Sequence, residues 1–287
     1  MKALKRYGQN FLVDKNILDC IIRQANLSAD DVILEIGPGH GVLTRALLAE
    51  NVKCVHCVEI DERMRPELED FSNEDSRLQV HWGDAVKYDY ALLNPFPNKV
   101  VANIPYNITT PLIWELLKFA GNGLTYHLYM LQKEAAMRLT ALPDTKERYP
   151  LGVTVEAMGF SRIVRNVSRE CFRPVPNVDS VLCEIVCEKN FELARDPLWS
   201  EILHRGFSHR RKTLANNLKD FADVLSYGGM RAEDLTCDEW LEIYERAKMQ
   251  KNSPAEILRR NLCEFPFSLV HWVRNYLYLI IFFNIRG

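Results

Sequence analysis

Short apolar runs alternate with amphipathic stretches between about residues 14 and 188, and this alternation limits the possible folds more than any other feature. The apolar runs have the length and composition of strands, and the stretches between them have helical spacing. This order predicts a parallel sheet with helices on both faces. We expect strands at residues 32–36, 53–59, 78–82, 99–102 and 126–131, and helices at residues 42–50, 62–71 and 111–119.

The pattern changes toward the end of this region. Two strand-like runs, residues 162–168 and 180–187, follow each other without a helix long enough for a crossover, so we expect them to pair antiparallel at the sheet edge. Helical patterns dominate after residue 190, at residues 198–207, 212–221 and 237–246. A chain of 287 residues has room for two domains. We therefore expect a domain over residues 1–189, a helical domain over 190–250, and a separate apolar tail over 251–287.

A glycine-rich loop, Gly37-Pro38-Gly39-His40-Gly41, follows the first expected strand. Glycines let the backbone turn tightly and come close to a ligand. A dinucleotide fingerprint has its third glycine one position later, where this chain has Val42. Glu35, just before the loop, suits a cationic ligand better than a pyrophosphate. S-adenosylmethionine carries a sulfonium and an ammonium and no phosphate. The loop thus favours this cofactor, with an NAD-dependent oxidoreductase as the alternative.

Acidic residues end the next two expected strands. Glu59 stands about 20 residues past the loop, where an acidic side chain accepts hydrogen bonds from ribose hydroxyls, as it also does in NAD proteins. Asp84, in Gly83-Asp84-Ala85, can accept from an adenine amino group, although for this residue alone an Asx turn is the more ordinary explanation. Both residues lie at carboxyl ends of parallel strands, where open α/β sheets bind ligands.

The strand at residues 99–102 leads into the tetrapeptide Asn103-Ile104-Pro105-Tyr106. The Asn103 amide oxygen and the Ile104 carbonyl can both accept from one amino group, Pro105 stiffens the turn, and Tyr106 offers a face for a flat base. An ordinary strand-to-helix turn is the alternative, with Thr109-Thr110-Pro111 supplying a capping hydroxyl and a first-turn proline. Together with the cofactor loop, the tetrapeptide favours a methyl-acceptor site for an adenine or cytosine amine.

Charge is close to balanced, with a net charge of −2 and a pI of about 6.4, so a nucleic acid must be bound through a local patch. The adjacent cations Arg210-Arg211-Lys212 favour phosphate contacts over a simply solvated helix face. The densest basic stretch comprises His204, Arg205, His209, Arg210, Arg211, Lys212 and Lys219, with Lys2, Lys5 and Arg6 near the other end.

Cysteine usage and apolar content bear on the compartment. Cys54 and Cys57 form a CxxC without a second pair at zinc spacing, and in a strand they point to opposite faces. We expect buried free thiols, no metal site and a reducing, cytoplasmic setting. The chain start has no apolar stretch long enough for a signal peptide. The apolar run at residues 276–283 is too short to span a bilayer, so we expect no stable membrane association. We expect a monomer.

Taken together, these motifs resemble those of the rRNA adenine N6-dimethyltransferases. The general motifs are residues 7–12, 37–41, 58–61, 83–85 and 103–106. Residues 131–134, 172–180 and 207–214 resemble the small-subunit (16S) enzymes, whose loss confers kasugamycin resistance. The resemblance covers about residues 5–250. Erythromycin-resistance methylases of large-subunit rRNA share the earlier motifs, but Arg210-Arg211-Lys212-Thr213 argues against them.

The resemblance implies a Rossmann-like α/β fold of the class I S-adenosylmethionine-dependent methyltransferases with a small C-terminal helical domain. It implies transfer of methyl groups to N6 of two adjacent adenosines in a 3′-terminal hairpin loop of small-subunit rRNA, with the pre-30S subunit as partner. A catalytically idle nucleic-acid-binding relative is the other alternative. No general base is needed, because the amine becomes acidic only after methylation.

The resemblance also assigns residues. Asn10 and Leu12 become a lid over the cofactor, whereas the residues alone show only an extended stretch before a helix capped by Asp14. Tyr106 and Phe172 become the two faces that hold the target base, with a core phenylalanine as the alternative for Phe172. The implied cofactor contacts are Asn10, Leu12, Gly37, Glu59, Asp84 and Asn103, and the implied catalytic residues are Asn103, Tyr106 and Phe172.

Overall fold

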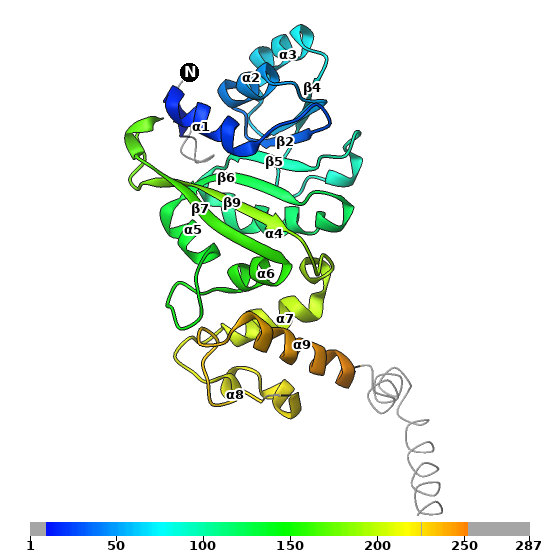
Figure 1. Ribbon diagram of the computed structural model, residues 1–287, viewed down its shortest axis with the longest axis vertical. Helices are drawn as coiled ribbons and strands as arrows, with labels where there is room; N and C mark the ends of the chain where they lie inside the picture. Colours follow the sequence, from blue (N-terminus) through cyan, green and yellow to red (C-terminus); the bar gives the residue numbers. More distant parts are fainter. Residues whose placement is uncertain (1–9, 225, 252–287) are drawn as a thin grey trace, which may run out of the picture.

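A seven-stranded sheet forms the centre of the molecule in the computed structural model, which describes residues 10–224 and 226–251 (Figure 1). Its strands are β2 (Val32–Ile36), β3 (Cys54–Glu59), β4 (Leu78–Trp82), β5 (Lys99–Asn103), β6 (Tyr126–Gln132), β7 (Gly159–Val167) and β9 (Ser180–Cys187). They lie in the order β4-β3-β2-β5-β6-β9-β7. The strands expected from the sequence are confirmed, with small shifts at their ends.

Strands β2 to β6 are parallel, and β9 runs antiparallel between β6 and β7. The antiparallel pair expected at the sheet edge is therefore confirmed, with β9 as its inner strand. Strand β2 has β3 on one side and β5 on the other, so the chain reverses its direction of progress across the sheet at this point. The crevice outside the carboxyl ends of two such strands is where open α/β sheets bind ligands.

Helices pack on both sides of the sheet (Figure 1). Helix α4 begins at Thr109, two residues before Pro111, and no side chain caps it. The expectation that a threonine hydroxyl caps this helix is therefore wrong. Helix α6 was not predicted, because it is apolar on nearly every side and shows no amphipathic period. These helices are α1 (Lys15–Ala25), α2 (Val42–Ala49), α3 (Arg65–Glu74), α4 (Thr109–Leu117), α5 (Lys133–Leu139) and α6 (Pro150–Met158).

A group of helices, α7 (Pro197–Gly206), α8 (Leu214–Asn217) and α9 (Cys237–Lys251), lies at one end of the sheet (Figure 1). The change from strands to helices near residue 190 is as expected. The buried core nevertheless continues across that position: Trp199 is fully buried, and its indole N–H donates to the Thr154 hydroxyl of α6 at 2.9 Å. The division into two domains stays a prediction, since both parts share one core.

Single turns of 3-10 helix join several of these elements. They are η2 (Glu62–Met64), η3 (Tyr90–Leu92), η4 (Tyr106–Ile108), η5 (Ala120–Asn122), η6 (Arg169–Cys171), η7 (Leu193–Arg195) and the longer, kinked η8 (Lys219–Val224). Of these, η4 carries Tyr106 out of strand β5 and into helix α4.

A second, two-stranded sheet joins the start of the chain to a distant segment. Strand β1 (Phe11–Leu12) pairs antiparallel with β8 (Phe172–Arg173), so that Leu12 lies opposite Phe172. The Asp14 carboxylate then accepts from the backbone N–H groups of Asn16 and Ile17, which confirms the expected cap of α1. The extended stretch foreseen before this helix is thus a paired strand.

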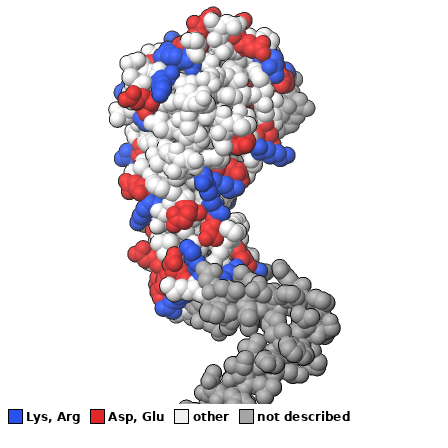
Figure 2. All heavy atoms as spheres, turned by 90° about the vertical axis from the view of Figure 1, so that its right-hand side faces the viewer, with Lys and Arg blue, Asp and Glu red and all other residues white. Residues whose placement is uncertain are grey.

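Several sequence expectations concern parts outside the described residues. These parts include Lys2, Lys5, Arg6 and the tail from residue 252, with its apolar run. In the part that the structure describes, no helix has the length and apolarity needed to cross a membrane. Cys54 and Cys57 are buried free thiols in β3, as expected. Figure 2 shows one face of the molecule, on which Lys and Arg are interspersed with Asp and Glu and surround a broad uncharged area.

Candidate cofactor and substrate site

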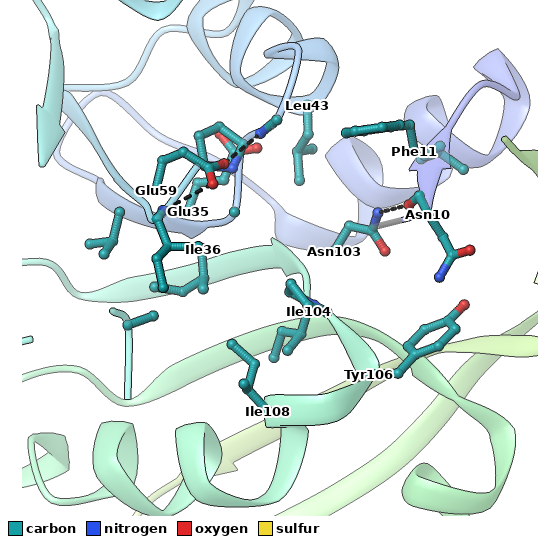
Figure 3. Close-up of a pocket in the computed structure, with 18 of the residues that line it drawn as sticks. Asn10, Phe11, Glu35, Ile36, Leu43, Glu59, Asn103, Ile104, Tyr106 and Ile108 are labelled. Atoms are coloured by element: carbon teal, nitrogen blue, oxygen red, sulfur yellow. Dashed lines mark hydrogen bonds between the residues drawn. The ribbon is translucent and has the colours of Figure 1, made fainter. Parts of the chain in front are cut away.

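A cavity of about 310 Å³ lies at the carboxyl ends of β2, β3, β4 and β5, where the strand order reverses (Figure 3). In Figure 3, Glu35 and Glu59 lie together on one side, and Asn10, Asn103 and Tyr106 lie on the other. The cavity is lined by all the cofactor residues expected from the sequence, namely Asn10, Leu12, Gly37, Glu59, Asp84 and Asn103, and also by Tyr106.

The glycine loop forms one wall of the cavity, and its conformation explains its composition. Gly37, Gly39 and Gly41 have φ values of 66°, 56° and 69°, in the left-handed region that favours glycine. A Cβ atom on Gly39 would lie 2.7 Å from Cε1 of Phe11, which belongs to strand β1. The loop and β1 can therefore approach each other only because residue 39 has no side chain.

Glu59 connects this loop to strand β3. Its Oε2 accepts from the Gly39 N–H at 3.0 Å, and its Oε1 accepts from the N–H groups of Ile60 at 2.9 Å and Asp61 at 2.8 Å. Burial raises the pKa of Glu59, and the three backbone donors oppose this rise. A carboxylate has about four acceptor positions, so Oε2 keeps one for a hydroxyl group of a ligand.

Asp84 fits both explanations that the sequence left open. Its Oδ1 accepts from the Val86 N–H at 3.0 Å, which is an Asx turn at the end of β4. The residue also lines the cavity, and its Oδ2 lies 3.8 Å from Nζ of the exposed Lys87. The turn thus holds the carboxylate in place at the cavity without engaging both of its oxygens.

Asn103 has its side chain oriented by the start of the chain. Its Nδ2 donates to the backbone carbonyl of Asn10 at 3.0 Å (Figure 3). Because the amide nitrogen is used in this bond, the amide oxygen remains as the acceptor. The residue that ends β5 and the residue that precedes β1 are therefore parts of one arrangement.

Tyr106 is held at its hydroxyl group. The Tyr106 hydroxyl and the fully buried Ser180 hydroxyl are 2.7 Å apart, which ties η4 to the start of β9. Burial raises the pKa of Tyr106, although the Ser180 hydrogen bond opposes the rise, so the phenol stays protonated near neutral pH. The ring is positioned beside Asn103 without depending on a ligand.

Phe172 does not meet the expectation of a second stacking face in this arrangement. Its side chain is 0% exposed, packs into the core beside β1 and is not part of the cavity lining. The alternative of a core phenylalanine describes its present position. Stacking on a base would require the ring to leave the core, because Phe172 belongs to β8 and is paired there with Leu12 of β1.

The structure also adds lining residues to which the sequence assigned no role of their own. Phe11 and His40 line the cavity, and their ring centroids are 4.8 Å apart. Apolar residues within the motifs or close to them line it as well, namely Ile36, Leu43, Val58, Ile60, Ala85 and Ile108. Their signal in the sequence is that they belong to a motif or lie close to one.

The basic stretch divides into structural and exposed cations. Arg210 donates to the Glu233 carboxylate from Nε at 3.0 Å and from Nη2 at 2.8 Å, and it stacks over Tyr149. A phosphate contact by Arg210 is therefore not supported by this arrangement. Among the described residues, no acidic side chain pairs with Arg211 or Lys212, and both are exposed.

The chemistry of the lining distinguishes the candidate ligands. Three carboxyl groups line the cavity, from Glu35, Glu59 and Asp84, and no Lys or Arg does so among the described residues. A pyrophosphate would find no cationic partner there, whereas a sulfonium or an ammonium meets acidic groups. This set of acidic side chains fits S-adenosylmethionine and disfavours NAD. Fold and site together define a class I S-adenosylmethionine-dependent methyltransferase.

Comparison with known proteins gives the family. The chain matches the family described as "Ribosomal RNA adenine dimethylase" over residues 1–259, and it belongs to this family. It is 38% identical over 251 residues to Ribosomal RNA small subunit methyltransferase A of Chromobacterium violaceum, covering 83% of this chain and 93% of the relative. The protein of the same name from Pseudomonas fluorescens is 40% identical over 259 residues, with 87% and 94% covered.

Solved structures agree with this assignment. A dimethyladenosine transferase from Plasmodium falciparum has a TM-score of 0.73 and 28% identity, covering 84% of this chain and 98% of its own. The 23S rRNA methyltransferase ErmE, at a TM-score of 0.63 and 24% identity, covers 83% of this chain and 100% of its own, and shares the fold. The protein is thus an S-adenosylmethionine-dependent adenine dimethyltransferase of ribosomal RNA.

Proposed function

We propose that the protein methylates N6 of two adjacent adenosines in the 3′-terminal hairpin loop of small-subunit rRNA, to the dimethylated product. The names of the relatives, "Ribosomal RNA small subunit methyltransferase A", support the small subunit as substrate. ErmE, a 23S rRNA methyltransferase, is less similar in sequence, at 24% identity. We further propose the pre-30S subunit as partner, a cytoplasmic location and a monomer.

One observation carries the mechanism: the Asn103 amide is oriented by Asn10, so that its oxygen is left to accept. The Asn103 oxygen and the Ile104 carbonyl would each accept a hydrogen from the adenine N6. This pair of bonds favours a pyramidal nitrogen, whose lone pair is otherwise delocalised into the ring. Bound S-adenosylmethionine supplies a methyl group activated by a positively charged sulfur. Positioning of reacting groups can lower a barrier by up to about 7–11 kcal/mol.

No side chain needs to act as a general base. Tyr106 stays protonated, and an amide such as Asn103 does not take up a proton near neutral pH. The amine becomes acidic only after methylation and then loses its proton to water. Monomethyladenine has one N6 hydrogen left, so one of the two acceptors is sufficient in the second round.

The target base must leave its stack to reach the cavity. Tyr106 would take one face of the base, because its ring is held beside Asn103. For Phe172 we propose a role only in an opened state, in which β8 has moved away from β1. The exposed Arg211, Lys212 and Lys219 of the helical part, residues 190–250, would contact RNA phosphates.

Labelled S-adenosylmethionine, small subunits that lack the modification, and large subunits provide the test. Label on two neighbouring adenosines near the 3′ end of the small-subunit rRNA is the expected result. Label on large-subunit RNA alone would overturn the proposed substrate. Cofactor binding without any methyl transfer would support the alternative of a nucleic-acid-binding protein without catalytic activity. Sedimentation of the free protein tests the monomer.

A further inference from the structure

Glu35 is a buried acidic residue in the cavity wall that the mechanism above does not use (Figure 3). Only 2% of the residue is exposed. The Thr44 hydroxyl, at 2.7 Å, and the Cys57 thiol, at 3.4 Å, both donate to the same oxygen, Oε2. Within the part of the chain that the structure describes, no donor reaches Oε1. A buried carboxyl group thus has one oxygen without a partner at a ligand cavity.

No positive side chain among the described residues compensates this carboxyl group. The titratable groups that face it are Cys57 and Glu59 from β3, while α2 contributes the uncharged Thr44. Burial raises the pKa of Glu35 to about 7; the hydrogen bonds from Thr44 and Cys57 oppose this rise, and Glu59 adds to it. Burial also raises the pKa of Cys57, which therefore remains a thiol. A change of one charge nearby is sufficient to switch the protonation of such a group near neutral pH.

We infer that Glu35 senses the charge of the cofactor and makes the protein prefer the cationic methyl donor over the neutral product. S-adenosylmethionine has a sulfonium where S-adenosylhomocysteine has a thioether, and the two otherwise differ only by the transferred methyl group. A cation in the cavity favours the ionised carboxylate, so donor binding sends the Glu35 proton to solvent. The product keeps the ammonium but has no sulfonium, so one positive charge is gone from the cavity. The carboxylate then takes a proton back from solvent more readily, and the product is held less tightly.

This inference rests on the cofactor and not on the RNA target. It can therefore fail while methyl transfer to small-subunit rRNA stands, and the reverse is also true. A binding measurement without RNA separates the two.

Calorimetric titration of the free protein with each of the two ligands, across neutral pH, is the direct test. Pairs of buffers with different ionisation heats count the protons released. Donor affinity is expected to rise by up to about tenfold per pH unit around neutrality, and product affinity to rise less. Identical pH dependence and proton release for both ligands would overturn the inference.

Two variants locate the group responsible. Glu35→Gln keeps the shape and an acceptor but cannot ionise, so the extra pH dependence of the donor should disappear. His40 is the rival, because it also lines the cavity and carries an ionisable ring. The matched control His40→Gln should keep the difference between donor and product. Loss of the difference in His40→Gln, with retention in Glu35→Gln, would assign the effect to His40.

A third variant covers the case in which Glu35→Gln does not fold. Thr44→Val removes a donor that favours the ionised carboxylate and nearly preserves side-chain shape. The pH midpoint of the donor preference should then move upward. An unchanged or lower midpoint in folded Thr44→Val protein contradicts the role of Glu35.

Discussion

The Asn103 side chain donates a hydrogen bond to the Asn10 carbonyl at 3.0 Å, although the two residues are 93 positions apart. Asn10 precedes β1, which covers the glycine loop, and Asn103 ends β5 at the proposed amine site. The orientation of the Asn103 amide therefore depends on the segment that leads into β1 being in place. Cofactor enclosure and preparation of the acceptor site are coupled through one bond.

Asn103→Ala should lower the methyl-transfer rate by about a hundredfold or more, since misplacement of a reacting group has an effect of this order. RNA binding should change little, because phosphate contacts dominate it. Single-turnover transfer and filter binding measure the two quantities. Asn73→Ala, in an exposed position of α3, is the control. Equal losses of transfer and RNA binding would contradict the positioning role.

Tyr106→Phe and Ser180→Ala should each lower the transfer rate about fivefold, as expected for a hydrogen bond of about 1 kcal/mol. Each change removes the hydroxyl contact that fixes the ring. The double variant should be no slower than either single variant, because both act on one bond. Cofactor affinity should stay constant. Additive losses would show that the two residues act separately.

Gly39→Ala should weaken cofactor binding and also destabilise the fold. Its left-handed φ of 56° costs an alanine about 1–2 kcal/mol, and the new methyl group would press on Phe11. Gly123→Ala is a matched control, because its φ of 107° is also positive but nothing lies within 4 Å of the added atom. Both variants should melt earlier. Only Gly39→Ala should lose cofactor affinity in calorimetry.

Charge reversal at Arg211 should weaken binding to small subunits. The slope of log affinity against log salt concentration should become shallower by about one. Cofactor affinity should be unaffected. Lys53→Glu makes a similar charge change at an exposed residue just before β3, away from the carboxyl ends of the strands. Arg210→Gln should instead lower the melting temperature, because Arg210 pairs with Glu233. An RNA-specific defect in Arg210→Gln, without loss of stability, would restore the direct phosphate contact.

Acid should destabilise the fold through His127. This residue is fully buried, and burial lowers its pKa from 6.5 to about 4. The unfolded chain takes up the proton at a higher pH than the folded protein. The contribution of His127 to the free energy of unfolding therefore declines as the pH falls from 6.5 toward 4, by about 1.4 kcal/mol per pH unit. Urea unfolding at several pH values measures this. His127→Asn should flatten the decline, whereas His209→Asn, at an exposed histidine, should not.

The sequence predicted the parallel strands well because each is a short apolar run, and in β2 and β3 every residue is buried. The strand ends then placed Gly37, Glu59 and Asn103 at one cavity. Helix α6 escaped prediction because seven of its residues, from Leu151 to Met158, are buried, so it has no polar face to define a period.

Long-range pairing accounts for the other differences. The β1–β8 pair has only two residues in each strand, too few for a pattern to reveal. This pairing buries Phe172, which the motif alone could not place in the core or in the cavity. In the same way, nothing near Arg210 in the sequence indicates Glu233 as its partner.

The pairing of β1 with β8 has a consequence for the order in which the molecule is made. Phe11 pairs with Arg173, so a growing chain cannot complete the cover of its cofactor cavity until synthesis has passed β8. The glycine loop and the first four sheet strands are complete well before that point. A nascent chain therefore has β1 without its partner strand during much of its synthesis, and this pairing forms only when both ends of the sheet region have emerged.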